Sequence, residues 1–380
     1  MKGNFKKFLK FAIIGPPNVG KSLLTNQLVQ ANVAAVSKRM DTTRRNLTAI
    51  YTNNYCQLVA LDSPGLVGIK HATTVSPNKD LSILTDPEKA LKKAEHILVV
   101  HDATHTGDYI QHRVMFLLHK YSHIPSTLVI NKIDLISQRN ELLPLVKVLT
   151  NNQVDGEKIV SKRVSFGRLG TINEDRIKSG NRNEIQLYNK TNFSIENQDE
   201  NWKKLYNTVM AKPFERCSWS ETKKLFSDIR GWSGFKSVFF VSSKTGEGID
   251  GLRDYLMRQS TLKDWKYNDD TLTTKNPNDI CVDHVRAACL NYLPSEVGYC
   301  LNISLMDWSY NSDQLNIIVE IKSSKKRWIK LLFNTTPTIL ELIEQNVNDI
   351  IKNLIKEPVY LKILVKYNGK TVTEKNYDSI

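Results

Sequence analysis

One short segment near the start of the chain constrains its fold more than any other. Residues 15–22 read Gly-Pro-Pro-Asn-Val-Gly-Lys-Ser and match the phosphate-binding pattern G-x-x-x-x-G-K-S/T. The segment follows an apolar stretch from Phe8 to Gly15 and precedes apolar residues at helical spacing from Ser22 to Val29. The pattern therefore predicts a strand, a loop and a helix whose N-terminus binds the phosphates of a nucleotide.

The residue types in this loop suit phosphate and metal contacts. Glycines allow backbone N–H groups to approach the phosphates, Lys21 can reach the β and γ oxygens, and the Ser22 hydroxyl can hold Mg²⁺. On its own, the pattern leaves ATPases and kinases open. The residues expected to bind the nucleotide here are Gly15, Pro17, Asn18, Val19, Gly20, Lys21, Ser22 and Leu23.

A second polar motif, Asp62-Ser63-Pro64-Gly65, follows a strand candidate at Cys56 to Leu61. The Asp62 carboxylate would emerge at the carboxyl end of that strand, where α/β sheets bind ligands, and would meet the magnesium shell through water. The Gly65 N–H could bond the γ-phosphate, and the segment that follows would act as a switch. Taken alone, these residues also fit an ordinary turn after a strand.

Two further motifs favour guanine over adenine. Asn131-Lys132-Ile133-Asp134 follows the strand candidate Thr127 to Ile130, and the Asp134 carboxylate can accept hydrogen bonds from guanine N1 and N2, which adenine does not offer. Lys132 would lie along the base plane, and Asn131 would tie neighbouring loops together.

The last motif follows the strand candidate Ser237 to Val241 and consists of Ser242, Ser243 and Lys244, whose N–H groups could reach guanine O6. Four motifs in this order, each after a strand candidate, outweigh a chance match. The sequence therefore predicts a site for GTP and GDP.

The loop before the second strand contains Thr42-Thr43-Arg44. A mobile loop at this point should supply a hydroxyl to Mg²⁺, and Thr43 is the predicted ligand; a threonine pair that merely starts a strand is the alternative. The predicted Mg²⁺ ligands are then Ser22, Thr43 and Asp62, and the predicted catalytic residues are Lys21, Thr43, Gly65 and Asn18.

The strand candidates, with stretches between them long enough for crossover helices, predict a mostly parallel α/β sheet. Residues 1–265 would form this domain, with a long polar insertion at about 137–230 in which Asn151 to Asn201 form a flexible surface excursion. Residues 266–276 would be a linker, and residues 277–380 would form a compact α-β-β-α-α-β module.

The formal charge of +14 and the pI near 9.4 favour contact with a polyanion such as RNA or an acidic lipid surface, although a solvated lysine-rich surface explains the charge equally well. The five cysteines lack metal-binding spacing, so reduced thiols without a disulfide partner are expected. Met1 to Lys7 is basic but too short for a convincing transit peptide.

With these motifs in place, the chain resembles the Era family of GTPases, especially its mitochondrial branch. Besides the nucleotide motifs, the resemblance rests on residues 81–87, Leu-Ser-Ile-Leu-Thr-Asp-Pro, and on Asp264-Trp265-Lys266-Tyr267. It implies a P-loop GTPase domain, then a smaller α+β type II KH domain that binds small-subunit ribosomal RNA. It also implies GTP hydrolysis coupled to assembly of the small ribosomal subunit, and a location in the mitochondrial matrix; apart from the resemblance, a cytoplasmic location stands open.

Two residues of the nucleotide motifs depart from, or extend, the usual catalytic pattern. Leu66 stands where Ras-like enzymes place a water-orienting glutamine, and leucine cannot hydrogen-bond water. In potassium-activated relatives of Era, an asparagine at the position of Asn18 helps to hold K⁺ over the phosphates. The alternative is that Asn18 only braces the loop.

The C-terminal module departs from the KH pattern at its loop. A KH domain has a G-x-x-G loop between paired helices, and the matching positions here read Asn334-Thr335-Thr336-Pro337. Thr336 before Pro337 is predicted to cap the following helix. A basic run beside the loop, which begins at Lys322, could attract phosphate or could be a solvated face. The candidate RNA contacts are Lys325, Lys326, Arg327, Lys330, Asn334, Thr335 and Thr336.

Three functions remain open from the sequence. The first is a GTPase that cycles on ribosomal RNA, and the second is a GTP-dependent switch or assembly factor with negligible turnover. The third is a GTPase that acts through protein partners or peripheral membrane contact without RNA binding by the KH-like module.

Overall fold

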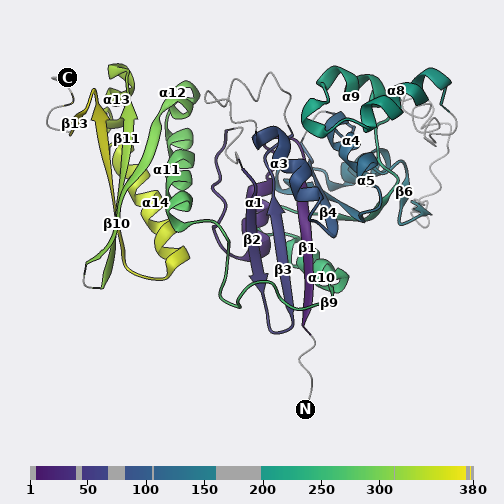
Figure 1. Cartoon of the computed structure of the whole chain (residues 1–380), viewed down its shortest axis with the longest axis horizontal. Helices are drawn as coiled ribbons and strands as arrows, with labels where there is room; N and C mark the ends of the chain where they lie inside the picture. The colour runs from purple at the N-terminus through teal and green to yellow at the C-terminus, as the bar shows by residue number, and fades with distance from the viewer. Residues whose placement is uncertain are drawn as a thin grey trace, which may run out of the picture.

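A computed structural model describes residues 6–39, 45–66, 82–104, 107–159, 198–311, 313–373 and 377. The described chain forms two α/β units that lie along the long axis of the molecule, the N-terminal domain and the C-terminal module (Figure 1). The prediction of a mostly parallel α/β sheet followed by a second, smaller module is confirmed.

The N-terminal domain is built on one sheet, with strand order β2-β3-β1-β4-β5-β8 and β9 beside β1. Among the strands in the described ranges of this domain, β2 and β9 run antiparallel to their neighbours and the others run parallel. The central strands are apolar on both faces, as expected for strands covered by helices on two sides. The strands are β1 (Lys7–Ile14), β2 (Leu47–Thr52), β3 (Cys56–Asp62), β4 (His96–Asp102), β5 (Ser126–Asn131), β8 (Phe235–Phe240) and β9 (Thr261–Leu262).

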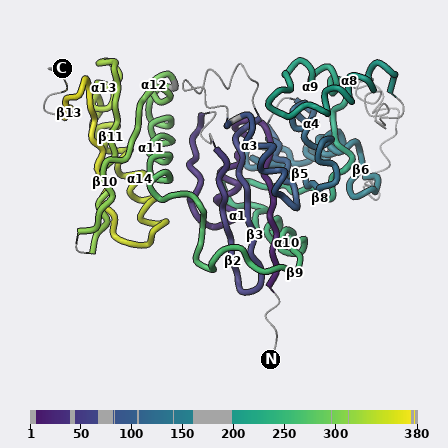
Figure 2. Tube along the Cα trace, viewed as in Figure 1, coloured from purple at the N-terminus to yellow at the C-terminus, as the bar shows by residue number. Residues whose placement is uncertain are grey.

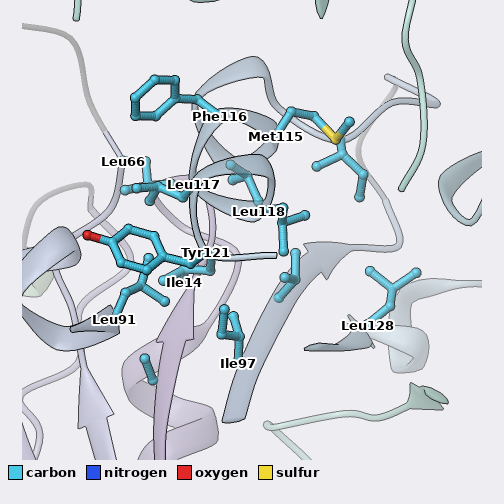
Figure 3. Close-up of a cluster of buried hydrophobic side chains, with 14 of the residues drawn as sticks. Ile14, Leu66, Leu91, Ile97, Met115, Phe116, Leu117, Leu118, Tyr121 and Leu128 are labelled. Atoms are coloured by element: carbon cyan, nitrogen blue, oxygen red, sulfur yellow. The ribbon is translucent and has the colours of Figure 1, made fainter. Parts of the chain in front are cut away.

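Helices cover both faces of this sheet and bury two apolar cores. One core holds the buried faces of α1 (Lys21–Val29) and α10 (Ile249–Gln259). The other core, part of which is drawn in Figure 3, packs α3 (Ser82–Leu91), α4 (His112–Lys120) and α5 (Leu142–Leu149) on the opposite face. Parallel strands between two helical layers place the loops at their carboxyl ends on one rim of the domain.

Part of the stretch predicted to be a polar insertion belongs to this core. It contains α5, the hairpin β6 (Gln153–Val154) and β7 (Glu157–Lys158), α8 (Glu200–Met210) and α9 (Trp219–Phe226). Val146, Phe214 and Phe226 from this stretch are buried in the same core as β4 and β5. Residues 160–197 lie outside the described residues, so the boundaries of an insertion stay a prediction. Each of these short helices has a narrow apolar face among many polar residues. The hydrophobic periodicity of the sequence is therefore weak in this stretch.

The C-terminal module has a four-stranded sheet, in the order β10-β11-β12-β13, with helices on one face. The core includes Ile317, Trp328 and Val347. The elements are α11 (Pro277–Tyr292), α12 (Ser295–Cys300), β10 (Asn302–Asn311), β11 (Gln314–Ser323), α13 (Lys326–Phe333), α14 (Ile339–Ile355), β12 (Val359–Tyr367) and β13 (Lys370–Val372). The expected α-β-β-α-α-β order is present, with α12 and β13 in addition.

The segment between the two units follows the sheet of the N-terminal domain. The buried Gln57 Oε1 accepts hydrogen bonds from the N–H groups of Lys266 and Tyr267, at 3.1 and 3.2 Å. Farther on, the Ile50 N–H donates to the Leu272 carbonyl at 2.8 Å, and the Thr273 hydroxyl donates to the Thr48 carbonyl at 2.7 Å. Within the described ranges, no helix is long and apolar enough to cross a membrane.

Candidate nucleotide-binding site

The phosphate-binding loop ends at the N-terminus of α1, whose N-cap residue is a glycine. Gly20 is the N-cap residue, with φ of 92°, and, as a glycine, it makes no side-chain hydrogen bond to the first turn. A Cβ atom at Gly20 would lie 2.4 Å from Asn131 Nδ2, so both the backbone conformation and the close approach require glycine. The N-cap residue therefore does not occupy the N–H groups of this turn, an arrangement that suits an anion.

Two other glycines allow the loop to pack against its neighbours. A Cβ atom at Gly15 would lie 2.5 Å from the Val100 carbonyl oxygen, and one at Gly65 would lie 2.8 Å from Pro17 Cα. The Leu66 N–H also donates to the Gly15 carbonyl, at 3.2 Å. The turn after β3 therefore lies directly against the phosphate-binding loop.

The Lys21 side chain folds back over the loop that precedes it. Its ammonium donates to the carbonyls of Pro16 and Gly15, at 2.8 and 3.3 Å, and the residue is buried. These contacts hold a positive charge at the loop, where a phosphate would be stabilised.

Asp62 is a buried carboxylate beside this charge. Among the described residues, neither of its oxygens accepts a hydrogen bond of good geometry. Burial raises its pKa to about 6, although the nearby Ser22 hydroxyl and Lys21 act to lower it. A buried, unsatisfied carboxylate beside a hydroxyl fits an oxygen-rich Mg²⁺ site. Thr43, the third predicted ligand, lies outside the described residues.

Asn131 joins three loops of the site. Its Nδ2 donates to the Val19 carbonyl at 2.8 Å, and its Oδ1 accepts from the N–H and the hydroxyl of Ser243, at 2.9 and 3.0 Å. The prediction that Asn131 ties loops together therefore has a direct geometric counterpart. The side chain is buried, so these bonds are shielded from water and fix the loops rigidly.

The side chains expected to contact guanine are also oriented by partners. Asp134 Oδ1 accepts from the Ser242 hydroxyl at 2.6 Å, and the Lys132 ammonium donates to Asp102 Oδ2 at 2.6 Å. Burial opposes ionisation of Asp102, but hydrogen bonds from Lys132 and Thr104 outweigh it and lower the pKa of Asp102. The sequence reasoning missed Asp102, although it stands at the carboxyl end of β4, like the motif residues that follow β3 and β5. Lys244 is exposed, so its expected contact depends on its N–H.

A cleft of about 470 Å³ lies beside the loop and includes Pro17, Asn18, Gly20, Lys21, Ser22, Leu23, Gly65 and Lys132 in its lining. Asn18 is exposed and has φ of 61°, a conformation that asparagine tolerates better than most residues. Residues 35–39 and Asn291 of α11 also line the cleft, and Asn291 Oδ1 accepts a hydrogen bond from the Lys38 N–H at 2.8 Å. Asn291 carries no sequence signal, because its role depends on how the module docks.

Leu66 belongs to the apolar core and not to the cleft. Only 1% of it is exposed, and it lies beside Leu117 of α4 in the close-up of Figure 3. It cannot orient a water molecule at the phosphates.

The loop of the C-terminal module differs from the sequence prediction in its cap. Thr338, and not Thr336, caps α14: its hydroxyl accepts from the Glu341 N–H at 3.2 Å, and Glu341 Oε2 accepts from the Thr338 N–H at 3.0 Å. The prediction of Thr336 was wrong because Glu341 stands three residues after Thr338, which completes a capping box there. Residues 334–337 are exposed, with the Thr335 hydroxyl donating to the Pro337 carbonyl at 2.9 Å.

The basic residues near this loop begin α13. Lys325, Lys326 and Arg327 are exposed, and the Lys325 ammonium lies 4.2 Å from the centre of the Trp328 ring. Lys330 is half-buried in the same helix. The exposed loop 334–337 follows the C-terminal end of this helix.

Comparison with known proteins supplies the family. Residues 10–132 match the family model described as 50S ribosome-binding GTPase. The chain is 42% identical to the mitochondrial GTPase Era of Caenorhabditis elegans over 97% of this chain and 92% of the relative. It is 30% identical to the mitochondrial GTPase Era of Danio rerio over 95% of this chain and 75% of that relative.

Solved structures agree in fold. An Era variant from Aquifex aeolicus bound to GDP·AlF4⁻ matches with a TM-score of 0.62 and 20% identity, over 95% of this chain and 94% of that one. Era in complex with MgGDPNP and nucleotides 1506–1542 of 16S ribosomal RNA matches with a TM-score of 0.62 and 19% identity, over 98% and 96%. Together with the extent of identity to the worm protein, the nucleotide motifs and the two-unit fold place this chain in the mitochondrial branch of the Era family of GTPases.

Proposed function

We propose that this GTPase uses Mg²⁺ to hydrolyse GTP and binds small-subunit ribosomal RNA in the mitochondrial matrix, where it assists assembly of the small ribosomal subunit. The observation that carries the nucleotide part is the shared network in which Asn131 bonds both the phosphate-binding loop and the loop at Ser243. The RNA part is supported by the similarity to Era, one of whose solved structures contains 16S ribosomal RNA.

Guanine is recognised by Asp134, with Ser242 fixing its carboxylate. The carboxylate accepts hydrogen bonds from guanine N1 and N2, and the Lys132 stem packs along the base. Adenine cannot donate these two hydrogen bonds to Asp134, so ATP binds much more weakly than GTP.

The phosphates lie at the N-terminus of α1, next to Lys21. Ser22, Thr43 and Asp62 would hold Mg²⁺, which neutralises phosphate charge when it is bound. Gly65 presents its N–H toward the γ-phosphate from the turn that contacts Pro17. Lys21 and the loop N–H groups stabilise charge that develops on the phosphate oxygens.

Since Leu66 is in the core, help with the attacking water comes from elsewhere. Asn18 is exposed on the cleft and is suited to hold K⁺ there, and its backbone conformation alone would account for its presence if it only braces the loop. Hydrolysis that is faster in potassium than in sodium, and that loses this preference in Asn18→Ala, supports the cation site. Equal rates in both salts would assign Asn18 to bracing.

The test of the enzymatic proposal is multiple-turnover GTP hydrolysis by the full chain with Mg²⁺. Release of many phosphates per protein supports an enzyme, and a single turnover or none supports the alternative of a nucleotide switch.

The test of the RNA proposal is binding of small-subunit ribosomal RNA by the full chain. Purified chain that binds vesicles or proteins but not RNA would favour the third function, in which membrane or protein contact replaces RNA.

The matrix location extends the names of the worm and zebrafish relatives, which are called mitochondrial. Isolated mitochondria treated with protease, with and without detergent, test it. Protection of the chain until the inner membrane is opened is the expected result.

A further inference from the structure

The positive charge of the chain is concentrated outside the KH-like module. Residues 277–380 contain 12 Lys and Arg residues and 12 Asp and Glu residues, so the formal surplus of +14 lies entirely within residues 1–276. A polyanion attracted to this protein is therefore attracted mainly by the N-terminal domain and the linker.

Helices α8 and α9 and the turn between them carry exposed basic side chains. Exposed cations at Lys204, Arg216, Lys223 and Lys224 stand on or between these helices. Within the part of the chain that the structure describes, none of the four forms an ion pair, whereas Lys203 and Lys212 are paired with Glu200 and Glu221. We call this set of four cations, together with Trp219, the α9 surface.

Trp219 adds an aromatic ring to the α9 surface. It is 42% exposed at the first position of α9, one helical turn before Lys223. A ring beside cations is the combination with which proteins stack a base and bind its phosphate. Because the other exposed residues of α9 are Ser220 and the two lysines, the helix has no wide apolar face with which to enter a bilayer.

The base of the α9 surface is rigid. The buried Arg113 side chain donates to the carbonyls of Cys217 and Phe214, at 2.8 and 3.3 Å. Ser218 caps α9 in a capping box with Glu221, which occupies the N-terminal amides of that helix. Any anion bound here is therefore bound by side chains, held on a fixed framework.

The α9 surface and the C-terminal module lie at opposite ends of the long axis (Figures 1 and 2). Two weak contacts on one flexible strand, at separate ends of a protein, bind more tightly than either contact alone.

We infer that the α9 surface is a second RNA-binding site, which binds single-stranded RNA by phosphate contacts to its cations and by stacking on Trp219. This inference rests on the proposed RNA binding and adds a site away from the KH-like loop.

The test measures binding of fluorescent 30-nucleotide polyuridylate to the full chain over a salt series. In Lys223→Gln/Lys224→Gln, the slope of log Kobs against log salt should become shallower by about 1.4, since each lost phosphate contact on a single strand contributes about 0.7. In Trp219→Ala, affinity should fall roughly tenfold with an unchanged slope, because stacking releases no counterions.

The matched control is Lys92→Gln/Lys93→Gln, another exposed lysine pair on the same domain with the same change of charge. Its slope should equal that of the wild-type chain. GDP binding by each variant reports that the domain remains folded, so that a loss of RNA binding is assigned to the surface.

The outcomes separate the two proposals. A wild-type chain that binds no RNA overturns both the proposed RNA function and this inference. A wild-type chain that binds RNA, with an α9 variant that keeps the same slope, overturns the inference alone. Loss of binding to phosphatidylserine vesicles in the α9 variant, with RNA binding unchanged, would make the surface a lipid contact and would also overturn it.

Discussion

Helices α1 and α14 both follow a loop expected to contact phosphate, yet their N-termini are built in opposite ways. Gly20 gives α1 no side-chain cap and no acidic residue in its first turn. Thr338 and Glu341 give α14 a complete capping box and a carboxylate in its first turn. A helix N-terminus attracts anions most strongly when its amides are available and its first turn carries no carboxylate. The comparison predicts that the first loop binds a nucleotide, whereas the second contacts RNA mainly through nearby cations.

The largest effect should come from Asp134→Asn. This substitution tests whether the site at the N-terminus of α1 recognises the guanine base or only the phosphates. We expect GTP affinity to fall about a thousandfold, because a buried polar contact is lost, and xanthosine triphosphate to bind in its place. Competition of each nucleotide against labelled GDP measures this. Unchanged preference would mean that another residue recognises guanine, and ATP binding as tight as GTP in the wild-type chain would remove the guanine site altogether.

A substitution at Gly20 should disturb the glycine N-cap that distinguishes the N-terminus of α1 from that of α14. Gly20→Ala places a methyl group 2.4 Å from Asn131 Nδ2 and strains a backbone with φ of 92°. Nucleotide affinity should fall about 100-fold, in line with a few kcal/mol of local strain. Calorimetric titration with GDP measures the change. Gly246→Ala, also at positive φ but with open space around it, is the control for strain without the clash.

The cap of α14 should matter for stability and not for the nucleotide. Thr338→Ala removes the acceptor for the Glu341 N–H and should lower the free energy of unfolding by about 1 kcal/mol. Denaturant unfolding, followed by the signal of the C-terminal module, measures this. Thr336→Ala is the matched control, since that exposed threonine does not cap the helix; an equal loss in both variants would contradict the cap assignment.

The smallest effect should come from restoring glycine in the module loop. With α14 still capped by Thr338, the Asn334→Gly/Pro337→Gly variant should change RNA affinity less than about threefold, because the helix amides stay occupied. A salt series with RNAs of different sequence measures this. Strong tightening would show that the backbone of this loop faces RNA and that the missing glycines alone limited it.

Much of the fold was predictable because its central strands are continuous apolar runs and its long helices have clear periodicity. The edge strand β2 was not, since Leu47–Thr52 mixes polar and apolar residues and gains order from its neighbours. Helices α8 and α9 were not predicted, because their apolar faces are short and lie among polar residues.

The nucleotide motifs were predictable because each is local in sequence. Contacts between distant segments were not: Asp102 beside Lys132 depends on strand order, and Asn291 beside Lys38 depends on docking of the module. The sequence does contain the capping pattern of α14, Thr338 followed three residues later by Glu341. The prediction chose Thr336 instead, because that threonine directly precedes Pro337.

The path of the linker has a practical consequence for solubility. An edge strand with unpaired N–H and C=O groups invites pairing with other chains, and β2 is such an edge. Leu272 and Thr273 cover part of it, through the bonds to Ile50 and Thr48. A fragment ending at Trp265 would uncover that edge and should aggregate on concentration, whereas one extended beyond Thr273 should remain monomeric. Light scattering of the two fragments would show which residues the N-terminal domain needs in order to remain monomeric in solution.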